Sequence, residues 1–272
     1  IGTRAQMIKM APVFQALDKH EVKYWFLHTG QHSDTFDDLR EEFNIRTPDT
    51  VAAGAAETNT LGKLLKWMFS AINETLFAKH RLLPVRKGVV LVHGDTLSTL
   101  WGAILGRFTG NKVLHIEAGL RSKRLLHPFP EEIVRRLTGI LATHHACPRN
   151  ESANNLGGTS NKVRSTEGNT LVDAVAYALE SGHSPEHIPE KPYTIASIHR
   201  AETLYNSNRL QKAIKILETL AEEMQILVVG HPSLLARLRN TSLINVLENN
   251  KNVEIVPRMA YTPFINLLAN AN

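Results

Sequence analysis

The stretch GVVLVHGDTLSTLWGAILGRFTGNKVLHIEAG, residues 88–119, decides the fold. An apolar run at 88–95 is followed by a helical segment at 96–110 and by a second apolar run at 111–119. Continuous apolar runs are typical of strands that are buried on both faces, as they are in parallel sheets. The order of strand, helix and strand therefore predicts one unit of a parallel α/β sheet.

The same alternation extends along most of the chain. We expect further strands at residues 22–30, 141–148, 192–199, 225–231 and 252–258. We expect further helices at residues 7–20, 61–80, 131–142, 170–182, 209–224 and 262–271. This pattern predicts an α/β protein with doubly wound parallel sheets.

The segment SGHSPEHIPEKP, residues 181–192, interrupts the alternation. Its three prolines and its lack of apolar periodicity are typical of a linker, so we expect a first domain at 1–180 and a second at 193–272. The chain opens at a glycine turn and stops at the end of a helix, and the second domain has only three expected strands. We therefore expect the chain to be truncated at both ends and the second domain to be incomplete.

Composition narrows the class of protein. The chain has 272 residues, of which 43% are hydrophobic, and no run approaches the ~18 apolar residues of a membrane helix. The net charge is +5, and the cationic residues are spread along the chain rather than grouped in runs. This distribution does not favour nucleic acid as a partner and is compatible with a small polyanionic ligand. The single Cys147 excludes an internal disulfide framework and favours a reducing cytoplasm.

Polar residues follow the expected strands where each one ends. Ligands of open α/β sheets bind beyond the carboxyl ends of the strands, so these residues are the candidates for a site. They are Gln31 and His32, His93 and Asp95, Glu117 and Arg121, His199 and Arg200, and His231. If each domain gathers its strand ends at one edge, two such edges facing one another make a cleft between the domains.

Most of these candidates can also be explained by a purely structural role. Asp95 is equally expected as a helix N-cap, and Glu131 as a carboxylate that offsets a helix dipole. Glu117 could be a solvated strand end. His199 with Arg200 is a stronger signal, because imidazole titrates near neutral pH and guanidinium binds phosphate in a bidentate manner. His144, His145 and Cys147 lie in one apolar run without a second ligand pair, so we expect no metal site.

Eight motifs together resemble the UDP-N-acetylglucosamine 2-epimerases of the non-hydrolysing type. They are GTRAQMIKMAP (2–12), TGQH (29–32), VHGDT (92–96), HIEAGLRS (115–122), PFPEEIVRRLT (128–138), GNTLVDA (168–174), HRAET (199–203) and GHPS (230–233). The resemblance implies two Rossmann-like domains of the glycosyltransferase-B type with the active site in the interdomain cleft. It implies conversion of UDP-GlcNAc to UDP-ManNAc, a precursor of surface polysaccharides, without a cofactor. It also favours a homodimer.

The resemblance assigns roles to particular residues. Those that it ties to catalysis are Asp95, Glu117, Glu131 and His199. Those that it implies in holding the nucleotide sugar are Arg4 and Lys9, and we add the strand-end and helix-start residues His93, Arg121, Arg135 and Arg200 as substrate contacts. Those that it implies in a second, activating UDP-sugar site are Gln31, His32 and His231, with Arg200 beside them.

The chain departs from the family pattern at several positions. Ala5-Gln6 stands in place of the usual Pro-Glu, Val134 in place of Asn, and Ala201 in place of Arg. The chain also ends where the family continues into a UDP-binding segment. These departures leave open an epimerase of another UDP-2-acetamido sugar, a hydrolysing epimerase, a glycosyltransferase and a non-catalytic UDP-sugar sensor.

Overall fold

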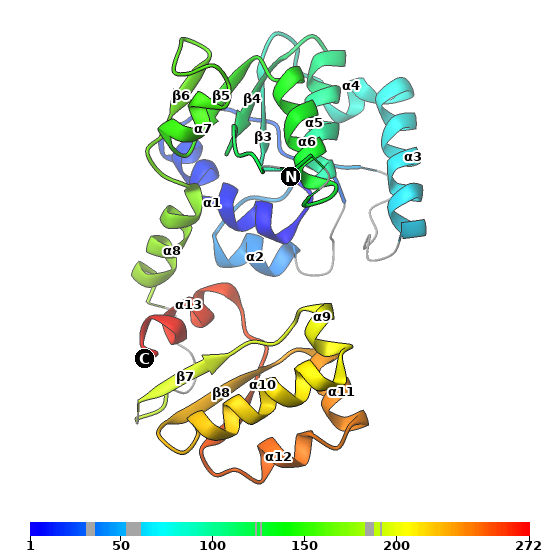
Figure 1. Cartoon of the computed structure of the whole chain (residues 1–272). Coiled ribbons are helices and arrows are strands. Elements are labelled where there is room, and N and C mark those ends of the chain that lie inside the picture. The colour runs from blue at the N-terminus through cyan, green and yellow to red at the C-terminus, as the bar shows by residue number, and fades with distance from the viewer. Residues whose placement is uncertain (31–35, 53–60, 123, 126, 183–187, 191) are drawn as a thin grey trace. The chain divides into compact units, whose positions relative to one another are not determined.

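A computed structural model of the chain describes residues 1–30, 36–52, 61–122, 124–125, 127–182, 188–190 and 192–272, with the backbone alone at 61–65 and 201. The chain divides into two compact units, unit 1 (1–177) and unit 2 (178–272), which are described in turn. Figure 1 gives the element labels. Within the described residues, no helix combines the length and the apolarity that crossing a membrane requires.

Unit 1 contains the strand, helix and strand that residues 88–119 predict. Strands β3 (Val89–His93) and β4 (Lys112–Ile116) pair in parallel, and α5 (Leu97–Phe108) connects them. Strands β5 (His144–Cys147) and β6 (Val163–Ser165) extend this sheet in the order β3-β4-β5-β6. Strands β1 (Leu27–His28) and β2 (Thr50–Val51) form a separate parallel pair.

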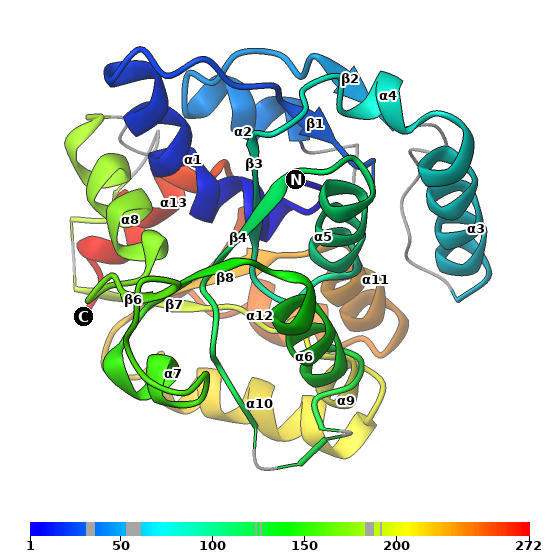
Figure 2. The ribbon, with the colours of Figure 1, turned by 90° about the horizontal axis from the view of Figure 1, so that it is seen from above.

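Helices lie on both sides of β3 and β4. Helix α1 (Arg4–Lys19) lies on one side, and α5 and α6 (Glu131–Leu141) lie on the other (Figure 2). Gly106 of α5 packs so closely on the sheet that a Cβ there would lie 2.9 Å from Val113. The other helices of this unit are α2 (Phe36–Glu42), α3 (Leu61–Phe77), α4 (Lys79–Leu82), α7 (Asn150–Asn154) and α8 (Thr170–Glu180), which runs on into unit 2.

Several expected elements of unit 1 have different bounds: the helix expected at 61–80 is divided into α3 and α4, and the strand expected at 141–148 is shorter. Two further differences have a clear physical cause. The predicted strand at 22–30 is wrong except at β1, because side chains take the place of a neighbouring strand: Arg46 donates to the Tyr24 carbonyl at 2.7 Å, and Asp49 accepts from the Phe26 amide at 2.6 Å. Helix α1 begins at Arg4 rather than at residue 7. Thr3 and Gln6 form a capping box that fixes this earlier start.

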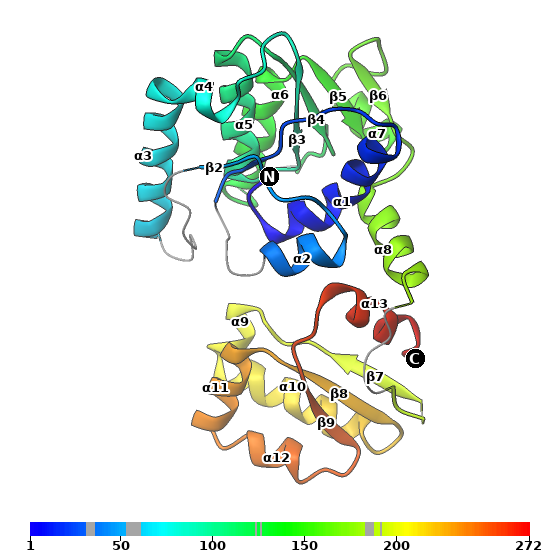
Figure 3. The same ribbon diagram turned by 180° about the vertical axis from the view of Figure 1, so that it is seen from behind.

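Unit 2 is a second parallel α/β sheet, with strands in the order β7 (Tyr193–Ala196), β8 (Gln225–Gly230) and β9 (Val253–Pro257) (Figure 3). Side chains of β8 alternate between two apolar clusters. Ile226 and Val228 pack with α10 (Ser207–Leu220), α11 (Pro232–Asn240) and α12 (Ile244–Glu248). Leu227 and Val229 pack with α13 (Tyr261–Ala269), so helices cover both faces. The predicted doubly wound α/β class is thus confirmed.

The predicted linker at 181–192 falls partly outside the described residues, at 183–187 and 191. Short helix α9 (Ala201–Leu204) follows the end of β7. Helices α11 and α12, like α2 and α7, are elements that the apolar pattern did not predict. Each of these helices has nine residues or fewer, too short to give a clear period of 3.6 residues.

Candidate active site

The carboxyl ends of β3 and β4 bring two candidate carboxylates to one edge of the sheet. His93 pairs in register with Ile116, so Asp95 and Glu117 both follow directly after paired strand ends. The Asp95 side chain accepts hydrogen bonds from Nε and Nη2 of Arg135 at 2.9 and 2.5 Å. Arg135 comes from α6, so the structure joins a strand end to a helix start through one ion pair.

Glu117 contacts both a lysine and a histidine at this edge. Lys9 Nζ of α1 donates to its two carboxylate oxygens at 2.7 and 2.9 Å, and His93 Nε2 lies 3.1 Å from Oε2. Burial alone raises the pKa of Glu117, but His93 and Lys9 outweigh it and lower the pKa to about 2. Glu117 is therefore a carboxylate at neutral pH, balanced by a cation from a different element.

The backbone at Glu117 is held in an unusual conformation. Its φ is +61°, in the left-handed region that residues other than glycine rarely adopt. Gly119, two residues later, also has positive φ, and a Cβ there would lie 2.1 Å from the Ser152 carbonyl oxygen. Such strain persists where surrounding contacts over-determine it and is common at active sites. Here it aims the Glu117 carboxylate at Lys9.

The two glutamates at the start of α6 have different surroundings. Glu132 is completely buried and accepts hydrogen bonds from the Ser122 amide at 3.0 Å and from Arg136 Nε at 2.9 Å. Glu131 is partly exposed, and its buried Oε2 has no hydrogen-bond partner in the described part of the chain. Glu132 therefore anchors the preceding loop, whereas Oε2 of Glu131 makes no hydrogen bond within the described residues.

Two buried polar side chains, Gln6 and His115, support this edge, and their supporting role was not predicted from the sequence. Gln6 accepts from the amides of Gly2 and Thr3 and donates to the His93 carbonyl at 2.9 Å. His115 Nε2 lies 2.7 Å from the Gly94 carbonyl oxygen. The signal that could have found His115 is its place as a polar residue inside an apolar run. Buried polar groups are almost always hydrogen-bonded, so such a residue is expected to have a partner.

The candidates of unit 2 form a separate group at the ends of β7 and β8. The rings of His199 and His231 lie 5.6 Å apart, and Ser197 Oγ lies 3.3 Å from His199 Nδ1. Burial lowers the pKa of His231, and Arg258 and His199 lower it further. Arg200 lies directly before α9, and its carbonyl accepts from the amides of Thr203 and Leu204.

Other expected site residues have less defined surroundings. Gln31 and His32 lie outside the described residues. Arg4 is the half-buried first residue of α1. Arg121 donates to the Leu120 carbonyl at 2.9 Å, and burial lowers its pKa, while Glu132 raises it.

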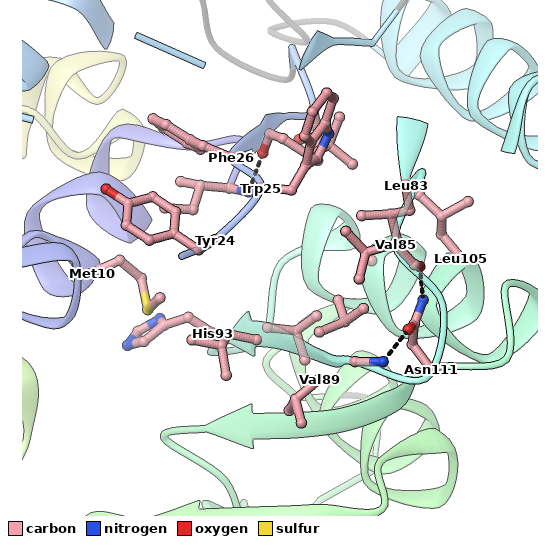
Figure 4. A pocket seen from close by; sticks show the side chains of 18 of the residues that line it. Met10, Tyr24, Trp25, Phe26, Leu83, Val85, Val89, His93, Leu105 and Asn111 are labelled. Carbon is pink, nitrogen blue, oxygen red and sulfur yellow. Dashed lines mark hydrogen bonds between the residues drawn. The ribbon is translucent and has the colours of Figure 1, made fainter. Parts of the chain in front are cut away.

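Unit 1 also contains a cavity of about 530 Å³, lined by α1, residues 22–27 and β3 (Figure 4). Its lining is mainly apolar, with Met10, Tyr24 and Val89 among the residues shown, and it contains neither Asp95 nor Glu117. A nucleotide sugar needs cations and hydrogen-bond donors for its diphosphate. We therefore place the candidate site at the strand ends rather than in this cavity.

Comparison with known proteins decides the family. The sequence model described as UDP-N-acetylglucosamine 2-epimerase matches residues 15–272. The UDP-N-acetylglucosamine 2-epimerases of Methanocaldococcus jannaschii and Methanococcus maripaludis are 31% and 32% identical to this chain, over 100% of it and 75% of their own lengths. The chain belongs to the UDP-N-acetylglucosamine 2-epimerase family.

Solved structures of UDP-N-acetylglucosamine 2-epimerases agree with the fold. The M. jannaschii enzyme in complex with UDP-GlcNAc and UDP has a TM-score of 0.75 at 29% identity, over 99% of this chain and 75% of that one. The Neisseria meningitidis enzyme bound to UDP-GlcNAc has a TM-score of 0.79 at 28% identity, over 99% and 74%. The predicted family and the Rossmann-like α/β fold of glycosyltransferase-B type are confirmed.

Two departures from the epimerase pattern have a structural explanation. Gln6 uses its amide nitrogen to donate to the His93 carbonyl and to Thr99 Oγ1, both at 2.9 Å, which an ionised glutamate cannot do. Val134 is 2% exposed, so an apolar side chain suits its place in α6. Neither change alters a carboxylate of the candidate site.

Proposed function

We propose that the protein is a UDP-N-acetylglucosamine 2-epimerase that interconverts UDP-GlcNAc and UDP-ManNAc. The observation that carries this proposal is the joint placement of Asp95 and Glu117 at one sheet edge, each paired with a cation from another element. Family membership supplies the reaction, and this arrangement supplies carboxylates and cations where the family's chemistry needs them.

The reaction needs both types of group. The C2–H of the sugar is not acidic, because no carbonyl adjoins it. If a base removes this proton while the C1–O bond to UDP breaks, the products are UDP and 2-acetamidoglucal. A β-phosphate oxygen of UDP then bonds to C1 again while a proton is delivered to the opposite face of C2, which inverts that centre. Carboxylates serve the proton transfers, and cations stabilise the departing diphosphate.

We assign proton transfer to Glu117 and Glu131, and positioning of the sugar to Asp95. His93 and Lys9 both lower the pKa of Glu117, and we propose that Lys9 turns toward the substrate diphosphate, which makes the carboxylate a stronger base. Glu131 has a buried oxygen without a partner among the described residues, which suits the second transfer. Arg135 orients Asp95, and His93 orients Glu117.

We assign binding of the substrate diphosphate to cationic residues that are named here for each unit separately. Arg4 and Lys9 at the start of α1 are cations near a helix N-terminus, which favours phosphate, and Arg121 adds a third charge. In unit 2, His199 and Arg200 are the corresponding candidates. His231, whose ring lies 5.6 Å from that of His199, is our candidate for an activating UDP-sugar site together with Gln31 and His32.

We further propose a homodimer in the cytoplasm that supplies a precursor of surface polysaccharides. The exposed apolar side chains of α3 support the dimer, and the buried unpaired thiol of Cys147 is in keeping with a reducing compartment.

One NMR experiment tests the proposed reaction. The protein is incubated with UDP-GlcNAc in heavy water, and the expected products are UDP-ManNAc and UDP-GlcNAc that both carry deuterium at C2. Free ManNAc with UDP would indicate the hydrolysing epimerase instead. Binding of UDP-GlcNAc without deuterium at C2 would indicate a UDP-sugar sensor, and turnover only with an added acceptor would indicate a glycosyltransferase. The same measurement with other UDP-2-acetamido sugars defines the substrate.

A further inference from the structure

His115 is a buried side chain that the proposed chemistry does not use. It lies on β4, is 1% exposed, and its Nε2 lies 2.7 Å from the carbonyl oxygen of Gly94. A carbonyl oxygen can only accept a hydrogen bond, so Nε2 carries a proton and donates. His115 thus reaches across from β4 to the turn that follows β3, one residue before Asp95.

Two other backbone groups at this turn are also held by hydrogen bonds. The His93 carbonyl accepts from Gln6 at 2.9 Å and from Thr99 at 2.6 Å. The Gly94 amide donates to the Ile116 carbonyl at 3.0 Å. Gly94 has a φ of +74°, so the chain bends sharply here. Without its partner the Gly94 carbonyl would be free to rotate, and the peptide bond that it shares with Asp95 would rotate with it.

We propose that His115 is a positioning residue for Asp95: its hydrogen bond to the Gly94 carbonyl fixes the peptide plane from which the Asp95 side chain reaches the substrate. Arg135 holds the carboxylate end of the same side chain. Asp95 is thus restrained at both its backbone and its carboxylate. The inference rests on the proposed epimerase reaction.

The charge state of His115 suits this role. Burial lowers its pKa to about 4, the Gly94 carbonyl opposes this shift, and His145, His93 and Arg121 add to it. The ring is therefore neutral at physiological pH, with its proton on Nε2. Nδ1 is buried and has no hydrogen-bond partner among the described residues, which an unprotonated nitrogen tolerates better than an N–H does.

Three variants separate this role from general packing. His115→Leu removes the donor, whereas His115→Gln keeps an N–H that reaches the Gly94 carbonyl. His145→Leu is the matched control, because His145 is the registered neighbour of His115 on β5 and its ring lies 6.4 Å away. We expect kcat/KM to fall roughly 10- to 100-fold in His115→Leu, the size of effect that a small misplacement of a reacting group produces. We expect His115→Gln to recover most of this loss and His145→Leu to change little.

A double-mutant cycle gives the decisive measurement. The affinity for UDP-GlcNAc is measured by titration calorimetry for the wild type, His115→Leu, Asp95→Asn and the double variant. If His115 acts through Asp95, its replacement has no further effect once Asp95 is already Asn. Losses that add in the double variant would show a general loosening of the sheet and overturn the proposal.

Other outcomes are equally decisive. If the wild type is active and His115→Leu has the same kcat/KM as His145→Leu, the positioning role alone is overturned. If the wild type shows no turnover, the epimerase function itself is contradicted. If His115→Leu does not fold, His115→Gln is compared with His115→Asn, whose shorter amide does not reach the Gly94 carbonyl. Equal kcat/KM in these two variants overturns the proposal.

Discussion

Lys9 forms an ion pair with Glu117, and replacing Lys9 tests what this pair contributes to stability. In Lys9→Met a partly buried carboxylate loses its cation, and we expect a loss of roughly 1–3 kcal/mol in the free energy of unfolding at pH 7. His93 and Lys9 together hold the folded-state pKa of Glu117 at about 2, below the ordinary value of 4.5, so the stabilisation that they give the carboxylate is fully present above pH 4.5 and is lost as the pH falls through 2. The difference between wild type and variant should therefore shrink over that interval in chemical denaturation.

Lys9→Arg is the control, because it keeps the charge at this position. It should retain most of the stability, and a pH-independent difference between Lys9→Met and wild type would contradict the assigned ion pair. Epimerase turnover, measured alongside, should fall in Lys9→Met, since the same cation is proposed to turn toward the diphosphate.

At the residue scale, the polar residues that follow the strands could be predicted from the sequence, but the side chains that hold them in place could not. Asp95 and Glu117 follow apolar runs, and parallel pairing places such residues at one edge whatever the side chains are. The pairing of Lys9 with Glu117 depends on how α1 packs on the sheet, which one-dimensional periodicity does not contain. The hydrogen bond from His115 to the turn after β3 depends on the register of β3 and β4 for the same reason.

The start of α6 offers two adjacent glutamates with opposite expected roles. Glu131→Gln should lower kcat by about 100-fold or more, because its carboxyl serves proton transfer, and should leave stability nearly unchanged, because Oε2 makes no hydrogen bond within the described residues. Glu132→Gln should instead lower stability by about 2 kcal/mol, because its buried carboxylate accepts charge-assisted bonds from Arg136 and from the Ser122 amide. Thermal unfolding and turnover are measured on both variants, and each is the control of the other. Reversed results would exchange the roles.

The turn after β4, beside Glu117, offers a test of how rigidly this backbone is packed. Gly119→Ala places a Cβ 2.1 Å from the Ser152 carbonyl oxygen in a residue with φ of +79°. Gly94→Ala has nearly the same φ, +74°, and no atom within 4 Å of the new Cβ. Gly94→Ala should cost about 1 kcal/mol of stability from the left-handed backbone alone. Gly119→Ala should cost clearly more, and equal losses in denaturant titrations would mean that the loop yields freely.

At the element scale, the long elements followed from periodicity and the short ones did not. Residues 96–110 and 209–224 give helices close to the predicted bounds, because their apolar faces repeat over several turns. The run at 22–30 misled the prediction, since its apolar residues are compatible with a strand while Arg46 and Asp49 occupy its backbone groups. Polar side chains that replace a neighbouring strand leave no mark on the apolar pattern.

At the scale of the whole molecule, alternation of strands and helices was enough to predict one parallel α/β sheet in each unit, whereas the separate pair β1-β2 was not predicted. Strands β3, β4 and β8 are continuously apolar or nearly so, which makes them easy to recognise. Helix α3 differs, because part of its apolar surface is exposed. Its apolar residues do not all serve a core: Trp67 and Ala71 pack inward, whereas Phe69, Ile72, Leu76 and Phe77 are 55–85% exposed.

These four side chains carry the last prediction, that α3 forms the interface of the proposed homodimer. Residues 69, 72 and 76 recur at helical spacing and so share one face, and contiguous apolar surface of this kind marks an interaction site. Light scattering after gel filtration should give twice the chain mass of 30.3 kDa for the wild type. Ile72→Asp should shift the mass to that of one chain, whereas Ile216→Asp, at a similarly exposed isoleucine of α10, should leave it unchanged. A wild type that stays at one chain mass at high concentration, or an Ile72→Asp variant that keeps twice that mass, would remove α3 as the interface.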